Sequence, residues 1–155
     1  YYITSPIIMS LLEARLPIVS LTVMVQKEAA QRLCAAPGSR EVGAVSIAVQ
    51  YYSQPQVLFQ VSRGSFMPSP DVDSTVIRLD VRQQPPVQLK REEDFFRVVK
   101  AAFSQRRKTL PNTLSAGLAI PKQQALDLLE RAGVASNLRA EQLSMQQFAD
   151  IANAL

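Results

Sequence analysis

The chain has 155 residues, 47% of them hydrophobic and 19% charged, with a net charge of +4, which is typical of a soluble globular protein with one domain or two small ones. A single cysteine, Cys34, and the absence of histidine argue against an internal disulfide, a zinc site and any Ser-His or Cys-His catalytic pair. No apolar run approaches the roughly 18 residues of a membrane span, so we expect a protein of the reducing cytoplasm with no membrane and no metal.

The first residues have no feature of a natural start. Tyr1-Tyr2-Ile3-Thr4 contains neither a Met nor the basic segment of a signal peptide, and it leads directly into sequence with helical periodicity. We therefore expect the chain to be part of a longer protein.

Helices and strands alternate in the first half of the sequence. Ser5-Pro6 is a helix start, and Pro17 closes that helix. The apolar, β-branched stretch 18–25 predicts a strand buried on both faces, as in a parallel sheet covered by helices. Residues 27–35 predict a second helix.

Two further strands follow. Residues 44–52 suit either a short helix or a buried strand, and we favour the helix because Pro55 and a strand over 57–61 come at once. The Pro-rich stretch 63–73 predicts a loop, and the alternation over 74–81 predicts a strand. About three strands cannot complete a doubly wound sheet, which again favours a missing N-terminal half.

The second half of the sequence predicts helices only. Residues 83–89 have the composition of a linker, and the acids Glu92, Glu93 and Asp94 favour a helix N-terminus. Pro111 prevents one continuous helix. A further helix over 121–132 stops at Gly133, and a capping box of Ser144 and Gln147 begins the last one.

The positive charge is concentrated in one segment. From 83 to 108 there are seven bases and three acids, so this segment carries the whole net charge of +4. Such an excess suits either a surface that faces a polyanion or a solvated helix face.

Three motifs, in one order, resemble ribosomal RNA adenine N6-dimethyltransferases. Tyr1 to Ile7 resembles the sequence that starts at the Tyr of the family's Asn-Leu-Pro-Tyr motif. Residues 66–74, FMPSPDVDS, resemble its Phe-x-Pro-x-Pro-x-Val-Asp-Ser motif, and residues 105–110, QRRKTL, resemble its C-terminal basic motif. The stretches 24–28 and 50–52 also fit.

This resemblance implies a fold, an activity and partners. We expect an α/β plus all-α chain: residues 1–84 form the C-terminal half of a Rossmann-like methyltransferase sheet, and 85–155 a small helical RNA-binding domain. The implied enzyme dimethylates adenines of 16S rRNA in the 30S subunit with S-adenosylmethionine, during ribosome biogenesis, as a monomer. None of the five glycines stands in a G-x-G arrangement, so we assign no cofactor-binding residue and expect the chain alone to be inactive.

The resemblance also assigns roles to individual residues. Tyr1 and Phe66 are the candidates for the aromatic faces that hold the flipped adenine; the alternatives are a frayed terminus for Tyr1 and a core plug for Phe66. Expected RNA contacts are Gln105, Arg106, Arg107, Lys108 and Lys100, whose alternative role is to stabilise a helix C-terminus.

Two rival functions remain open. The first is a large-subunit rRNA methylase of the macrolide-resistance type, which shares the first two motifs, although the Gln-Arg-Arg-Lys-Thr stretch favours the small-subunit group. The second is a non-catalytic RNA-binding module or a transcription-factor relative of the same fold.

Overall fold

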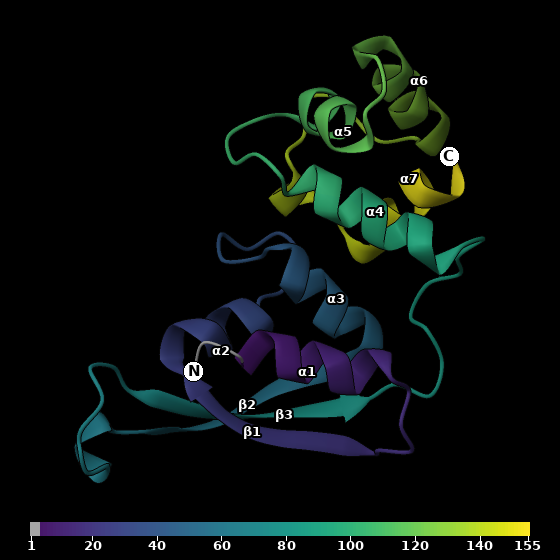
Figure 1. Cartoon of the computed structure of the whole chain (residues 1–155). Helices are drawn as coiled ribbons and strands as arrows, with labels where there is room; N and C mark the ends of the chain where they lie inside the picture. The colour runs from purple at the N-terminus through teal and green to yellow at the C-terminus, as the bar shows by residue number, and fades with distance from the viewer. Residues whose placement is uncertain (1–3) are drawn as a thin grey trace.

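The computed structural model describes residues 4–155 and stacks a helical bundle on an α/β layer. Three strands form a sheet, and helices α1 (Thr4–Glu13), α2 (Lys27–Leu33) and α3 (Ala44–Tyr52) cover one face of it (Figure 1). The bundle lies on the far side of α3 from the sheet. The sequence 44–52, which suited a helix or a strand, is thus a helix.

The sheet is antiparallel throughout the described residues. Its strands are β1 (Ser20–Gln26), β2 (Ser53–Val61) and β3 (Ser74–Val81), in the order β1-β3-β2. The central strand β3 aligns Ile77 with Val23 of β1 and with Val57 of β2. The parallel arrangement that we expected for β1 is therefore wrong for its pairing with β3.

The burial of β1 also differs from the prediction. Exposed residues alternate along it with more buried ones, and Val19 before it is 86% exposed, whereas we expected residues 18–25 to be buried on both faces. The reason is the placement of the helices, since α1, α2 and α3 all lie on one face (Figure 1). β-branched and apolar composition alone does not distinguish a strand covered on one face from one covered on both.

The core of the α/β layer lies between the sheet and these helices. Ile8 and Leu12, four residues apart on α1, share one helix face and are buried in a cluster with Leu33, Ile77 and Leu79. The alternation of β3 directs Ile77 and Leu79 into this cluster and Arg78 to the other face.

The predicted helices of the second half are confirmed. They are α4 (Glu92–Ala102), α5 (Leu110–Leu118), α6 (Lys122–Ala132) and α7 (Met145–Asn153). Gly133 ends α6 in the left-handed conformation, with φ of 72°. The capping box is reciprocal. The backbone amide of Gln147 donates to Ser144 Oγ at 3.2 Å, and the backbone amide of Ser144 donates to the side-chain Oε1 of Gln147 at 2.9 Å.

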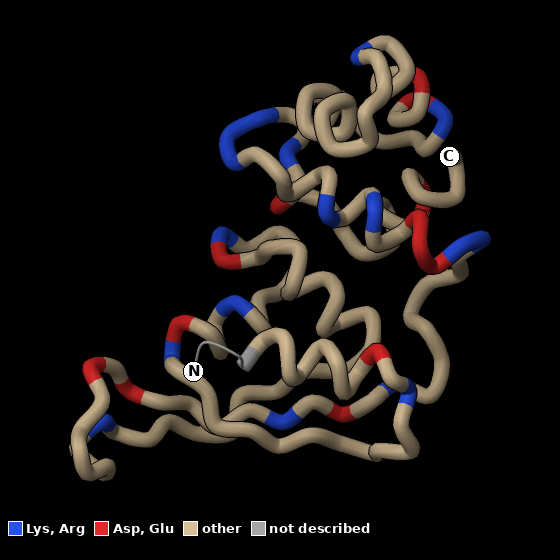
Figure 2. Tube along the Cα trace, viewed as in Figure 1, with Lys and Arg blue, Asp and Glu red and all other residues tan. Residues whose placement is uncertain are grey.

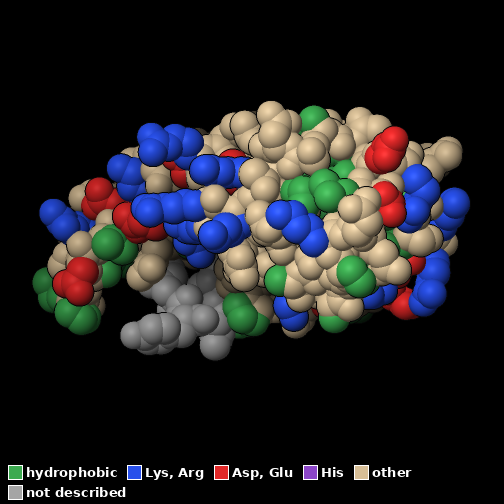
Figure 3. All heavy atoms as spheres, turned by 90° about the horizontal axis from the view of Figure 1, so that it is seen from above, with side chains coloured by type: hydrophobic (Ala, Val, Ile, Leu, Met, Phe, Trp, Pro, Cys, Tyr) green, Lys and Arg blue, Asp and Glu red, His purple; other side chains and the backbone are tan. Residues whose placement is uncertain are grey.

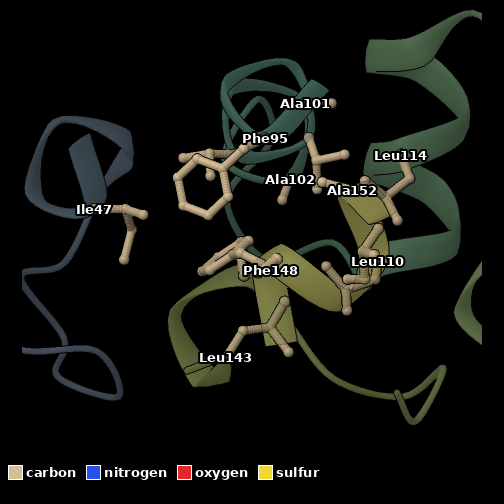
Figure 4. Close-up of a cluster of buried hydrophobic side chains, with 14 of the residues drawn as sticks. Ile47, Phe95, Ala101, Ala102, Leu110, Leu114, Leu143, Phe148 and Ala152 are labelled. Carbon is tan, nitrogen blue, oxygen red and sulfur yellow. The ribbon is translucent and has the colours of Figure 1, made fainter. Parts of the chain in front are cut away.

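The bundle core extends into α3. Phe95 of α4 and Phe148 of α7 lie at its centre, and Ile47 of α3 projects toward them (Figure 4). Val87, in the irregular segment between β3 and α4, is only 8% exposed and joins the same cluster. The two parts thus share a core at α3, and the boundary between residues 84 and 85 stays a prediction.

Helices α4 and α5 lie in close contact at Gly117. A Cβ atom on this residue would lie 2.4 Å from Ala101 Cβ and 2.6 Å from its Cα. We expect Gly117→Ala to lower the free energy of unfolding by about 1–3 kcal/mol, because overpacking outweighs the gain in helix propensity of about 1 kcal/mol.

Urea denaturation measures this effect. The control is Gly64→Ala, whose new Cβ would have only Ser62 Oγ nearby, at 3.7 Å. Equal stability of the Gly117→Ala variant and the parent would show that the two helices separate at no cost.

Candidate nucleic-acid interface

The loop between β2 and β3, which contains Phe66, lies on the side of the molecule where α1 begins (Figure 1). It contains a short 3-10 helix, Arg63–Ser65, after which Phe66 is half-buried and Met67 is 99% exposed. Phe66 belongs to neither hydrophobic cluster, and its ring contacts no other aromatic ring of residues 4–155. These observations disfavour the core-plug alternative.

Asp73 ties this loop to the sheet. Its Oδ1 accepts a hydrogen bond from the Arg63 amide at 2.9 Å, and its carbonyl accepts one from the Lys27 amide at 3.0 Å. The Arg63 guanidinium donates to the Asp71 carbonyl at 2.8 Å, and Ser69 Oγ donates to the Arg63 carbonyl at 2.8 Å. Asp73 and the Asp71 carbonyl therefore order the loop. No cluster of metal-binding side chains is found in the described part of the chain.

Tyr1, the other predicted base-binding residue, lies outside the described residues. The stacking roles of Tyr1 and Phe66 stay predictions.

The basic motif occupies the exposed connection between α4 and α5. Because α4 ends at Ala102, the side chains of Arg106, Arg107 and Lys108 lie beyond its last turn. Lys100 is on that turn and is exposed. None of these four bases forms an ion pair with any residue from 4 to 155, so their charges are available to an external anion.

A cleft with a volume of about 480 Å³ lies beside this connection. We call it the basic cleft, since its lining contains five arginines and two glutamates: Arg32, Arg40, Arg106, Arg107, Arg139, Glu41 and Glu141. One wall comes from α2 and the segment that leads to α3, and the other from the α4–α5 connection and the residues around 140.

The pictures locate this charge. In Figure 2 the blue α4–α5 connection lies on the same side as the charged tip between α2 and α3. Figure 3 shows a dense group of Lys and Arg side chains at the left of the upper face. A group of guanidinium side chains suits the phosphates of a polyanion, because a guanidinium can bind two phosphate oxygens at once.

The first wall of the basic cleft is held against α3. Ser46, fully buried on α3, donates to the Arg32 carbonyl and accepts from the Gly43 amide at 3.0 Å. Gln50 donates to the Ala35 carbonyl. These bonds tie the segment between α2 and α3 to the helix that also reaches the bundle core.

The cleft contains only part of the predicted set. Gln105, Arg106 and Arg107 line it, whereas Lys108 and Lys100 do not. Sequence reasoning missed Arg32, Arg40 and Arg139, since each is an isolated base in a segment whose charges balance. No local signal marks them, because they meet only through the packing of the two parts.

The described residues do not fit S-adenosylmethionine. Such a cofactor needs a glycine-rich turn between a strand and a helix, whereas β1 runs directly into α2 through Gln26-Lys27-Glu28. No helix in the part of the chain that the structure describes is long and apolar enough to cross a membrane.

Comparison with known proteins identifies the family. The family profile described as "Ribosomal RNA adenine dimethylase" matches residues 1–155. A "Ribosomal RNA small subunit methyltransferase A" of Desulfitobacterium hafniense is 50% identical over 155 residues, which are 100% of this chain and 55% of that protein. The protein of the same name from Lachnoclostridium phytofermentans is 48% identical, over 99% of this chain and 53% of its own length.

Solved structures agree on the fold. A dimethyladenosine transferase from Plasmodium falciparum superposes with a TM-score of 0.83 at 25% identity, over 97% of this chain and 62% of that one. A 23S rRNA methyltransferase superposes with a TM-score of 0.69 over 100% of this chain and 62% of that one; at 24% identity it shows the fold alone.

The predicted fold class is confirmed: the chain has the C-terminal half of a Rossmann-like methyltransferase sheet followed by a small helical part. It spans about half the length of the curated relatives that it matches. With the motifs in order along the chain and the family profile matched from end to end, the chain belongs to the ribosomal RNA adenine dimethylase family.

Proposed function

We propose that the protein containing this chain dimethylates adenine N6 in 16S rRNA of the 30S subunit, with S-adenosylmethionine as methyl donor, during ribosome biogenesis. The observation that carries this proposal is the basic cleft in a member of this family. The α4–α5 connection, which contributes to its lining, lies on the same side of the molecule as the loop between β2 and β3 (Figures 1 and 2). The names of its relatives, which are small-subunit rRNA methyltransferases, support the choice of substrate.

In this proposal the basic cleft binds the RNA backbone. The arginines of its two walls contact phosphates, which gives affinity with little dependence on base sequence. Lys108 and Lys100, exposed just outside the lining, extend the positive surface along the RNA.

Phe66 and Tyr1 hold the target base. An adenine N6 is reached only when the base leaves its stack, and an aromatic face compensates for the stacking that is lost. The anchored loop favours such a role for Phe66, because Asp73 fixes its position before the base arrives. Tyr1 supplies the second face by its place in the family motif.

The chain described here supplies RNA contacts and part of the base site. Because its residues do not fit the cofactor, we expect the 155-residue chain alone to bind rRNA without methylating it, and the complete protein to act as a monomer in the cytoplasm. A large-subunit rRNA substrate and a purely RNA-binding role are the alternative outcomes, and methylation assays of the complete protein on 30S and 50S subunits separate them.

Replacing Phe66 tests the base site. Phe66→Ala in the complete protein should lower kcat/KM for rRNA methylation by roughly 5- to 150-fold, the equivalent of about 1–3 kcal/mol of stacking. RNA affinity should change little, since phosphate contacts dominate it. Radiolabel transfer to 30S subunits and filter binding measure the two quantities.

The neighbouring residue provides the control for this variant. Met67 is 99% exposed, and Met67→Ala should leave both quantities unchanged. A Phe66→Ala protein with full activity would remove Phe66 from the base site.

Replacing the cleft arginines tests the RNA interface. The double variant Arg106→Ala, Arg107→Ala should weaken rRNA binding by about 10- to 100-fold at moderate salt. It should also reduce the slope of log K against log salt by about 1.4–1.8, because two phosphate contacts are lost. Lys122→Ala, exposed at the start of α6 and outside the cleft lining, is the control for the loss of a single charge. An unchanged salt slope in the double variant would place the RNA elsewhere.

A further inference from the structure

Helices α3 and α4 each connect the basic cleft to a second cluster of side chains. At one end, Ala44 of α3 and Ala102 of α4 line the cleft. At the other end, Tyr51 of α3 and Glu92 of α4 meet through a hydrogen bond of 2.7 Å. A change in the angle between the helices at this second end therefore changes the distance between the cleft walls.

Glu92 joins three segments that are far apart in the sequence. Its Oε2 accepts from the hydroxyl of Tyr51, which is 4% exposed, and from the Arg15 guanidinium at 2.5 Å. Arg15 follows α1 in the left-handed conformation, with φ of 51°, and its guanidinium lies 5.9 Å from the centre of the Tyr52 ring. We call Arg15, Tyr51 and Glu92 the clasp.

Aromatic rings pack against the clasp. Tyr51 lies 5.2 Å from Phe95 and 5.3 Å from Phe96, and Tyr52 stacks on Phe96 at 5.7 Å. Apolar contacts of this kind bring α3 and α4 together but are tolerant of small rotations. The hydrogen bonds to Glu92 are directional, so they restrict the angle at which the helices meet.

The protonation states of the clasp suit this role. Burial and the Glu92 carboxylate raise the pKa of Tyr51 to about 12, so its hydroxyl remains a donor at neutral pH. Partial burial works against the charge of Glu92, but hydrogen bonds from Tyr51 and Arg15 outweigh it and lower the pKa of that carboxyl. At neutral pH the Tyr51 hydroxyl is therefore a donor and the Glu92 carboxylate an acceptor.

The length of α4 turns a small rotation at the clasp into a larger displacement at the cleft. Helix α4 has 11 residues, which makes it about 16 Å long. A tilt of a few degrees at Glu92 thus moves its cleft end by about 1 Å, enough to spoil a hydrogen bond from an arginine to a phosphate.

We propose that Glu92 is a positioning residue, which sets the spacing of the arginines on the two walls of the basic cleft without touching RNA. This inference rests on the proposed function. Removal of a negative charge should by itself strengthen RNA binding, through long-range electrostatics. Loss of the clasp should weaken RNA binding, so the two effects of replacing Glu92 have opposite signs.

The test compares Glu92→Ala with Glu93→Ala in the complete protein. Glu93 is the adjacent acid, is exposed and, among residues 4–155, forms an ion pair with Arg91 alone, so its variant removes the same charge and leaves the clasp. We expect Glu92→Ala to weaken binding of small-subunit rRNA about five- to tenfold and to lower the salt slope, with Glu93→Ala equal to the parent or slightly tighter.

Two further measurements address the case in which Glu92→Ala fails to fold, and one of them reports the separation of the cleft walls directly. Arg15→Ala changes an exposed side chain, should reproduce the effect, and should not add to Glu92→Ala in the double variant. Spin labels at Ala36→Cys and Ser136→Cys, in a Cys34→Ala background, follow the separation of the two walls without RNA, and this distance distribution should broaden when the clasp is lost.

The outcomes separate this inference from the proposed function. RNA affinity of Glu92→Ala equal to or tighter than that of the parent overturns the positioning role. If the unaltered protein does not bind the rRNA, the proposed function fails. The spin-label distances then decide whether Glu92 holds the walls, and an unchanged distribution overturns that role too.

Discussion

The packing of α3 against α4 is the contact on which the rest of this structure depends. Ile47 and Tyr51 leave the sheet side of the molecule and enter the core built around Phe95 and Phe148. Because α3 also covers the sheet through Val49, one short helix belongs to both hydrophobic clusters. The basic cleft exists only because this helix brings the segment between α2 and α3 opposite the α4–α5 connection. A protein with the same two parts and a loose contact at α3 would carry the same arginines without a cleft.

Local chemistry was sufficient to predict most of the fold. The acids that begin α4, Gly133 after α6 and the capping box at Ser144 act within a few residues, and the structure has each of them in place. The strand β1 was predicted with the wrong burial and the wrong pairing direction. Both properties depend on which elements lie beside the strand in space, and a β-branched stretch has no local feature that reports them.

The residues of the candidate site also divide into those that the sequence predicts and those that it does not. The Phe66 loop and Gln105, Arg106 and Arg107 were found because they are continuous motifs with a family resemblance. Arg32, Arg40 and Arg139 were not, since they are separated in sequence and become neighbours only when α2, the loop after it and the segment near 140 come together. The two lysines of the predicted set lie outside the cleft lining because of where α4 ends, which charge counting along the sequence does not define.

The charges of the basic cleft have a consequence for how RNA binding would respond to ions in its surroundings. Among the described residues, the charged side chains of its lining are those of arginines and glutamates. If the cleft binds RNA as proposed, Mg²⁺ and polyamines compete directly with its guanidinium groups for the same phosphates. Occupancy of the cleft by RNA would then follow the concentrations of divalent ions and polyamines, the same variables that govern compaction of the RNA itself.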